Sequence, residues 1–265
     1  MSVAEKLTTI SKNMTRIYNA GYAAGQSAGG NSGVVPELSS VFADNTWGDI
    51  VWACQNNAVP DSWAVGDEKT MAIDGYDVVI AICGKDHDEY VDGGIAPLTF
   101  TVKTAFMSAP LYDHTVDEIQ EELIGFYPGL VPYNMTDYCT TILPGIIQTM
   151  PVEVQAGLRA VRKPSIHSTE KKFTYDVCEK LWLFSENEVR TQSGQWSGIR
   201  NEGETYPYVF AYCKHIEGYD ISFFTRTYSS QNYNAILCCD QEFGCGSFTD
   251  EQVDVSKPII FGFCF

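Results

Sequence analysis

The first two dozen positions carry an apolar stripe with heptad spacing. Its members follow one another at steps of four and three residues, at Val3, Leu7, Ile10, Met14 and Ile17. A helix over residues 1–25 places them on one face with the 3.5-residue period of a coiled coil. Because so short a helix is marginal in water by itself, the stripe favours self-association. The alternative is an amphipathic helix that lies on its own domain.

Residues 26–44 are expected to form a flexible linker, because Gly and Ser dominate the first half of this segment. The globular domain is then expected over residues 45–265. The spelling Gly-x-Ser-x-Gly around Ser27 falls where a helix, not a strand, precedes it. We therefore interpret it as linker composition and not as the turn that carries a nucleophilic serine.

From residue 45 onward, short apolar runs alternate with polar turns, which predicts the α+β class. A helical pattern begins at Thr46, and Asp74-Gly75 predicts a hairpin. The closing apolar segment is expected to lie centrally in a sheet, since a chain end stays ordered only when it is tied down. Strands are expected at 70–73, 78–83, 98–102, 181–184, 208–212, 221–224, 235–238 and 259–263, and helices over 116–126 and 151–163.

The charge balance excludes some partners. The chain has 17 basic and 34 acidic side chains among its 265 residues, a net charge of −17. Nucleic acid is not an expected partner, because the phosphate backbone needs a basic face. A membrane is not expected either, since there is no apolar run long enough to span one and no secretory signal pattern. The nine cysteines are expected to be mostly small buried hydrophobes, not a disulfide framework.

Five patches of this chain form a recognisable series, at 45–67, at His87-Asp88 with 94–100, at 158–163, at 179–189, and at 223–227 with 261–264. In this order they resemble a domain family of unknown function found in gut bacteria of the Firmicutes type and in their phages. The segment from Ala109 to Tyr138 departs from that pattern, and the family's usual Trp-x-Leu-Arg-Ser step is altered here, although Arg226 is kept.

The closing pattern is similar to C-type-lectin-like domains, including those on phage receptor-binding proteins. Residues 1–7 and 18–21 resemble the start of small virion proteins of Firmicutes phages. The resemblance implies a C-type-lectin-like α+β domain with short strands and long loops, carried on a homo-oligomer that is a trimer by resemblance. It implies location in the virion, contact with other virion proteins through the first helix, and a host surface glycan or protein as ligand. Because folds host many functions, these implications rest on analogy.

Candidate chemistry is sparse. The acidic loop with Asp86, Asp88 and Asp92 could hold a calcium ion, but its spacing is not that of the standard calcium loop. We expect an acidic turn that His87 and Asp88 fix by hydrogen bonds, with calcium as the weaker alternative and no cofactor otherwise. No catalytic residues are assigned, since no motif has the context that its mechanism requires.

The best binding candidate is the polar and aromatic segment at 228–243. Tyrosine offers rigid amphipathic area, and amide side chains offer adaptable hydrogen bonds, a combination suited to sugars. The resemblance implies a phage tail-fibre or receptor-binding adhesin, and the lack of a catalytic motif in its proper context argues against an enzyme. The alternatives are a capsid decoration or head-fibre protein and, less favoured, a tethered glycan-cleaving enzyme. The candidate ligand residues are Tyr228, Gln231, Asn232, Tyr233, Asn234, Asp240, Glu242 and Phe243.

Overall fold

The fold comes from a computed structural model of the whole chain. The expected N-terminal helix, the first part of the linker, the helix at 116–126 and most of the expected strand at 208–212 lie outside the described residues. The structure describes residues 35–103, 105–111, 133–166, 174–189, 203–206, 209, 223–228, 235–240, 247–252 and 255–265.

A five-stranded antiparallel sheet forms the centre of the described structure, in the order β1-β2-β3-β12-β7. The expected hairpin at Asp74-Gly75 is confirmed, with Ile73 opposite Tyr76. The closing strand lies between β3 and β7, so its expected central place is also confirmed. The strands are β1 (Glu68–Ile73), β2 (Tyr76–Lys85), β3 (Leu98–Val102), β7 (Leu181–Leu183) and β12 (Phe261–Cys264).

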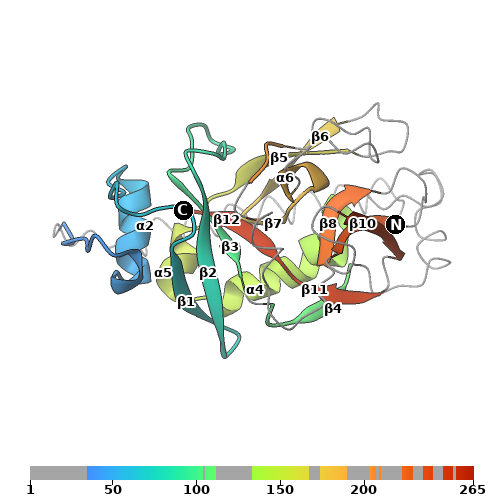
Figure 1. The fold of residues 1–265 in the computed structure, drawn as a ribbon, viewed down its shortest axis with the longest axis horizontal. Coiled ribbons are helices and arrows are strands. Elements are labelled where there is room, and N and C mark those ends of the chain that lie inside the picture. The colour runs from blue at the N-terminus through green and yellow to red at the C-terminus, as the bar shows by residue number, and fades with distance from the viewer. Residues whose placement is uncertain are drawn as a thin grey trace, which may run out of the picture.

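Smaller antiparallel sheets flank the central one. Figure 1 shows α2 and α5 near one end of the molecule and β8 and β10 near the other. A three-stranded sheet has the order β10-β9-β8, and two further pairs are β11 with β4 and β5 with β6. These strands are β4 (Ser108–Pro110), β5 (Val161–Ile166), β6 (Thr174–Glu179), β8 (Phe223–Tyr228), β9 (Ala235–Asp240), β10 (Ser247–Gln252) and β11 (Ser256–Pro258).

The helical elements are short. None in the described ranges is long and apolar enough to cross a membrane. The combination of short helices with mostly antiparallel sheets confirms the expected α+β class. The elements are η1 (Phe42–Asp44), α2 (Trp47–Gln55), η2 (Tyr133–Met135), η3 (Tyr138–Ile142, a π-helix), α4 (Leu143–Thr149), α5 (Val152–Gly157) and α6 (Glu186–Val189).

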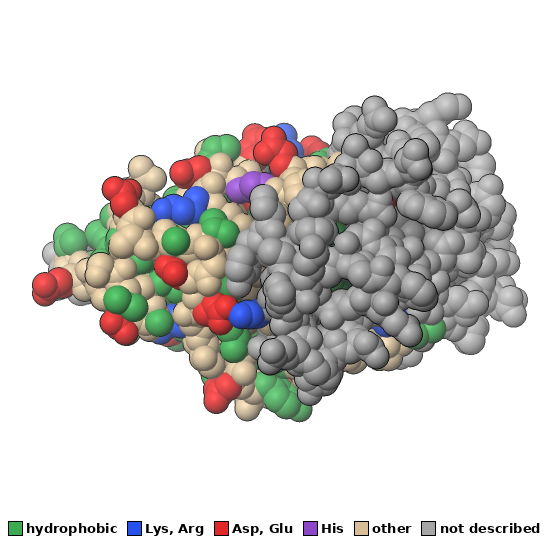
Figure 2. Space-filling view, viewed as in Figure 1, with side chains coloured by type: hydrophobic (Ala, Val, Ile, Leu, Met, Phe, Trp, Pro, Cys, Tyr) green, Lys and Arg blue, Asp and Glu red, His purple; other side chains and the backbone are tan. Residues whose placement is uncertain are grey.

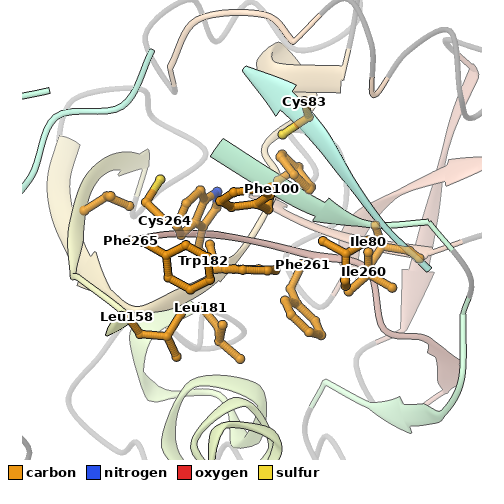
Figure 3. Close-up of a cluster of buried hydrophobic side chains, with 14 of the residues drawn as sticks. Ile80, Cys83, Phe100, Leu158, Leu181, Trp182, Ile260, Phe261, Cys264 and Phe265 are labelled. Atoms are coloured by element: carbon orange, nitrogen blue, oxygen red, sulfur yellow. The ribbon is translucent and has the colours of Figure 1, made fainter. Parts of the chain in front are cut away.

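The strands β3, β12 and β7 of the central sheet are buried on both faces, whereas β1 at its edge exposes alternate residues. All five residues of β3 are buried, as expected for a strand with elements packed on each side. The rings of Phe100 and Phe263, which are opposite each other on β3 and β12, stack with centroids 5.2 Å apart. Figure 3 shows Trp182 and Phe261 within the same cluster. At Gly262 a Cβ would lie 2.8 Å from the Trp182 ring, so only glycine fits there.

The packed domain begins earlier than expected. Phe42 is 2% exposed and belongs to the core, and the Trp63 indole N–H donates to the Ser39 carbonyl at 3.0 Å. The flexible linker expected over 26–44 is therefore too long at its C-terminal end, because the Phe42 ring is buried in the core of the domain. The helix that follows has a capping box, in which Thr46 and Asp49 satisfy each other's backbone N–H groups.

The helix expected over 151–163 is wrong in its second half. It ends at Gly157, which packs against Val51 so closely that a Cβ would lie 2.6 Å from that side chain. Leu158 is already extended, and residues 161–166 form β5, paired with β6. The apolar spacing of Val154, Leu158 and Val161 fits a helix, but pairing with a distant strand overrides that local preference. All three are buried as expected.

The cysteine expectation holds in part. Cys54, Cys83 and Cys264 are buried, whereas Cys139 is partly buried and Cys178 is exposed. Burial raises the pKa of Cys54 to about 12, so this thiol stays protonated at neutral pH.

Candidate functional site

Four charged side chains from separate segments meet in the interior. Asp88 follows β2, Lys163 lies on β5, Glu188 on α6 and Arg226 on β8. Each side chain is at most 4% exposed. We call these four residues the ion cluster. Two carboxylates and two cations balance its formal charge.

Lys163 is the hub of the ion cluster. Its ammonium donates to Asp88 Oδ1, to Glu188 Oε1 at 2.9 Å and to the Tyr206 hydroxyl at 2.7 Å. The Tyr206 hydroxyl lies 2.6 Å from both Asp88 oxygens and donates to that carboxylate. A lysine ammonium has three protons to donate, and these three acceptors match them.

Arg226 joins the cluster because β8 is bulged. Phe224 pairs with Cys238 and Tyr228 with Ile236, so four steps on β8 match two on β9. A bulge bends a strand and redirects its side chains. The Arg226 N–H donates to the Phe184 carbonyl at 2.9 Å, and its guanidinium donates to Glu188 Oε2 and to the Leu183 carbonyl.

Glu188 is fixed by further backbone contacts. Its Oε2 accepts from the Ser185 N–H at 2.9 Å, and its carbonyl accepts from the Tyr206 N–H at 2.7 Å. Gly203 has φ +110°, and a Cβ there would lie 2.7 Å from Glu188 Oε1. This position therefore requires glycine both for conformation and for space.

The electrostatics keep all four groups of the cluster charged. Burial alone would raise the pKa values of Asp88 and Glu188, but the neighbouring cations outweigh it and both are lowered, Asp88 chiefly by Lys163 and Glu188 chiefly by Arg226. Burial would lower the pKa of Lys163, yet Glu188 and Asp88 raise it. Paired burial of this kind keeps charges ionised in the interior.

Aromatic rings surround the ammonium. Lys163 Nζ lies 4.6 Å from the Trp182 ring centroid and 5.0 Å from that of Tyr206. The His87 ring stacks on Tyr206 at 4.0 Å. This apolar surrounding strengthens the charge interactions inside it, since little water screens them.

The acidic loop does not gather its three aspartates around a common point for an ion. Asp88 points inward to Lys163, Tyr206 and Thr99, Asp92 pairs with Arg159, and Asp86 is exposed. Among the described residues no group of three potential metal ligands is found. Asp88 does fix the loop, because its carbonyl accepts from the Ala96 N–H at 2.7 Å.

A second acid, Glu179, is partly buried and has different surroundings. Glu179, at the end of β6, accepts from the Tyr133 hydroxyl at 3.3 Å and interacts with the Cys139 thiol. Burial raises the pKa of Glu179 to about 7, although Cys139, Tyr133 and Arg226 act in the opposite direction. Tyr133 also accepts from the Leu183 N–H at 2.9 Å, which ties this acid to the central sheet.

The structure separates the two halves of the candidate ligand segment. Tyr228 ends β8 and precedes residues 229–234, whereas Asp240 ends β9 and precedes residues 241–246. Because both strand pairs are antiparallel, Tyr228 and Asp240 lie at opposite ends of the three-stranded sheet, about 14 Å apart along β9. Gln231, Asn232, Tyr233, Asn234, Glu242 and Phe243 lie outside the described residues.

Surface charge does not single out a site on the face shown in Figure 2. Acidic and basic side chains are interspersed over its described part. Searches of protein-family models, of curated proteins and of solved structures found no match for this chain. The resemblance to a lectin-like phage domain therefore stays a prediction.

The sequence pattern does not predict most of the ion cluster. Lys163, Glu188 and Tyr206 are not site candidates there, and Asp88 is expected only to fix the acidic turn or, as the weaker alternative, to bind calcium. A usable signal was present, because Lys163, Glu188 and Arg226 each lie in a short segment that also holds buried apolar residues. Charges in such positions are buried only when paired. Tyr206 gave no comparable signal.

Proposed function

We propose that this chain is a receptor-binding adhesin of a phage particle, of the tail-fibre type, which presents a lectin-like domain to a host surface glycan or protein. In this proposal residues 1–25 form the helix that oligomerises the chain and attaches it to other virion proteins. The chain is made in the host cytoplasm and exposed on the particle.

The anchoring of β8 is the observation that carries the proposal. Arg226 ties the middle of β8 to the ion cluster and to Leu183 and Phe184 of the central region. Two residues later the strand enters the segment that begins at Tyr228. Binding loops are commonly held by a rigid scaffold, and a strand fixed by buried charge suits that purpose.

The ion cluster supports a binding role over catalysis. A general acid or base needs a pKa near the working pH and access to substrate. Asp88 and Glu188 are fully buried, and their pKa values are lowered by the cations beside them. Both carboxylates are thus committed to Lys163 and Arg226, which favours a structural task for them.

The test is a glycan array and a host-cell binding assay with the full-length chain. The expected result is saturable binding to a surface glycan or to intact host cells. Asn232→Ala with Tyr233→Ala is expected to weaken that binding at least tenfold.

A matched pair of variants uses the other end of the sheet. Glu242→Ala with Phe243→Ala changes the segment after β9, so the two pairs together show which end contacts the ligand. Binding that neither pair weakens would remove the assignment to 228–243. Absence of any binding to cells or glycans would overturn the adhesin proposal.

A further inference from the structure

The ion cluster holds the three groups that an internal amide cross-link requires. The primary amine of Lys163 is in direct contact with the Asp88 carboxyl group, which can acylate it, and with a second carboxyl group, that of Glu188. They come from three separate segments of the chain. We propose that Lys163 and Asp88 condense to form an intramolecular isopeptide bond, with Glu188 as the proton acceptor. This goes beyond the adhesin proposal and does not depend on it.

The step balances within the cluster. Glu188 Oε1 lies 2.9 Å from Lys163 Nζ and takes a proton from the ammonium. The freed amine attacks Asp88 Cγ and a C–N bond forms. Glu188 then gives up the proton it took and the nitrogen loses a second one, and with these two protons one carboxyl oxygen of Asp88 leaves as water. Tyr206 provides a path for them, because its hydroxyl lies 2.7 Å from Nζ and 2.6 Å from both Asp88 oxygens. No oxidant, reductant or activating group is needed.

Charge balance distinguishes this site from an ordinary buried ion pair. Condensation removes one positive and one negative charge, those of Lys163 and Asp88. Glu188 then remains paired with Arg226 and with the Ser185 N–H. The product leaves no unpaired buried charge, which would be strongly unfavourable. Replacing a buried ion pair by a neutral amide also relieves part of its desolvation cost.

Proximity and dryness let slow chemistry proceed. The reacting groups are at most 4% exposed and stay in contact as long as the domain is folded. Holding two reactants in contact gives effective concentrations far above those in solution. The amine is charged in the ground state, so the reaction passes through a minor species in which Glu188 or Asp88 carries its proton. Exclusion of water disfavours the reverse hydrolysis.

The bond would join distant parts of the fold. Asp88 and Lys163 are 75 residues apart, and the link connects the loop after β2 to β5. A covalent link of this kind restricts the unfolded chain, as a disulfide does, but resists reductants. Such a link suits a protein that is exposed outside the cell.

The experiment is intact-mass spectrometry of the purified full-length chain, followed by peptide mapping. The expected mass is that of the sequence less one water, with a branched peptide that joins the segments of Asp88 and Lys163. Lys163→Arg is expected to show no water loss. Glu188→Gln is expected to abolish the loss or slow it at least tenfold. Lys103→Arg, which changes a surface pair with Glu68, is expected to keep it.

Each other outcome counts against the proposal. A wild-type chain with its full mass after prolonged incubation in the folded state overturns it, and so does a water loss that maps to another pair. Cross-linking of Glu188→Gln at the wild-type rate removes Glu188 from the step. If Lys163→Arg does not fold, the branched peptide in the wild type decides alone. Binding to glycans or cells is not part of this readout, so failure here leaves the adhesin proposal standing.

Discussion

Two acidic side chains, Glu179 on β6 and Glu188 on α6, have pKa values that are shifted in opposite directions. Glu188 accepts charged hydrogen bonds from Arg226 and Lys163, and its pKa is lowered although burial acts to raise it. Glu179 has two neutral partners, the Tyr133 hydroxyl and the Cys139 thiol, and burial raises its pKa to about 7. Glu188 is 0% exposed and Glu179 is only partly buried, so burial alone would raise the pKa of Glu188 more; its charged partners reverse that order.

The comparison shows what it takes to keep a charge inside this fold. Removing a carboxylate from water costs several kcal/mol, and neutral hydrogen-bond donors offset only part of that cost. Neighbouring cations offset more of this desolvation cost, but only when the backbone holds them in place. The bulged strand β8 holds Arg226 beside Glu188, and the Ser185 N–H holds the Glu188 carboxylate. Glu179 is therefore expected to respond to pH near neutrality, and Glu188 is not.

Loss of a cation should have the largest effect. Arg226→Met removes a guanidinium that is 0% exposed and leaves Glu188 with Lys163, which it shares with Asp88. Breaking a buried charge pair in this way is expected to lower the free energy of unfolding by about 3–5 kcal/mol. Urea unfolding followed by circular dichroism measures it.

The matched control for that variant is Arg162→Met. Arg162 lies one residue from Lys163 but is 44% exposed, and its pair with Asp176 spans 3.7 Å. A surface pair of this kind contributes less than about 1 kcal/mol. Equal losses from the two variants would contradict the assignment of Arg226 to the ion cluster.

The pH dependence of stability tests Glu179 directly. Its pKa is raised from 4.5 to about 7 in the folded chain, so the folded state keeps a proton that the unfolded state has released. Its stabilising contribution is complete below pH 4.5 and is lost as pH rises to about 7. The loss is at most about 3–4 kcal/mol, because each pKa unit corresponds to about 1.4 kcal/mol.

Glu179→Gln should remove this dependence. The amide keeps the size of the side chain and cannot ionise, so the free energy of unfolding should stay level between pH 5 and pH 8 where that of the wild type falls. Asp88 and Glu188 have lowered pKa values and act with the opposite sign, since their contribution is lost only in acid. A wild-type profile without the neutral decline would argue against a protonated Glu179.

Gly262→Ala tests the packing around Trp182, next to the ion cluster. The added Cβ would lie 2.8 Å from Trp182, whose ring also lies against the Lys163 ammonium. Overpacking of this kind costs about 1–3 kcal/mol, measured by thermal or urea unfolding. Gly145→Ala is the control, since nothing lies within 4 Å of that position in α4. It should be neutral or slightly stabilising.

The smallest effect is expected far from both acids. Thr46→Ala removes the side-chain cap of α2, whose hydroxyl accepts from the Asp49 N–H at 3.1 Å. The expected cost is about 1 kcal/mol, with no change in the pH profile of Glu179. A change in that profile would mean that the two regions are coupled.

Local signals in the sequence were enough for several elements. Asp74-Gly75 predicts the hairpin because two-residue hairpin turns with positive φ at both positions favour Asp followed by Gly. Both residues have positive φ here. Apolar runs predicted β3, β7 and the closing strand. The helix from Pro151 was predicted too long, because Val161 fits a helical period and its partner strand, β6, cannot be identified from local pattern.

The sequence by itself determined the α+β class, the hairpin, the capped helix and the burial of the closing strand, since each depends on residues that are close in the chain. Only the tertiary structure decided which charges meet. Asp88, Lys163, Glu188 and Arg226 come from four segments, and their shared site depends on strand pairing and on the bulge in β8. The fate of a buried charge is set by neighbours distant in sequence, because attraction between charges acts through space and not along the chain.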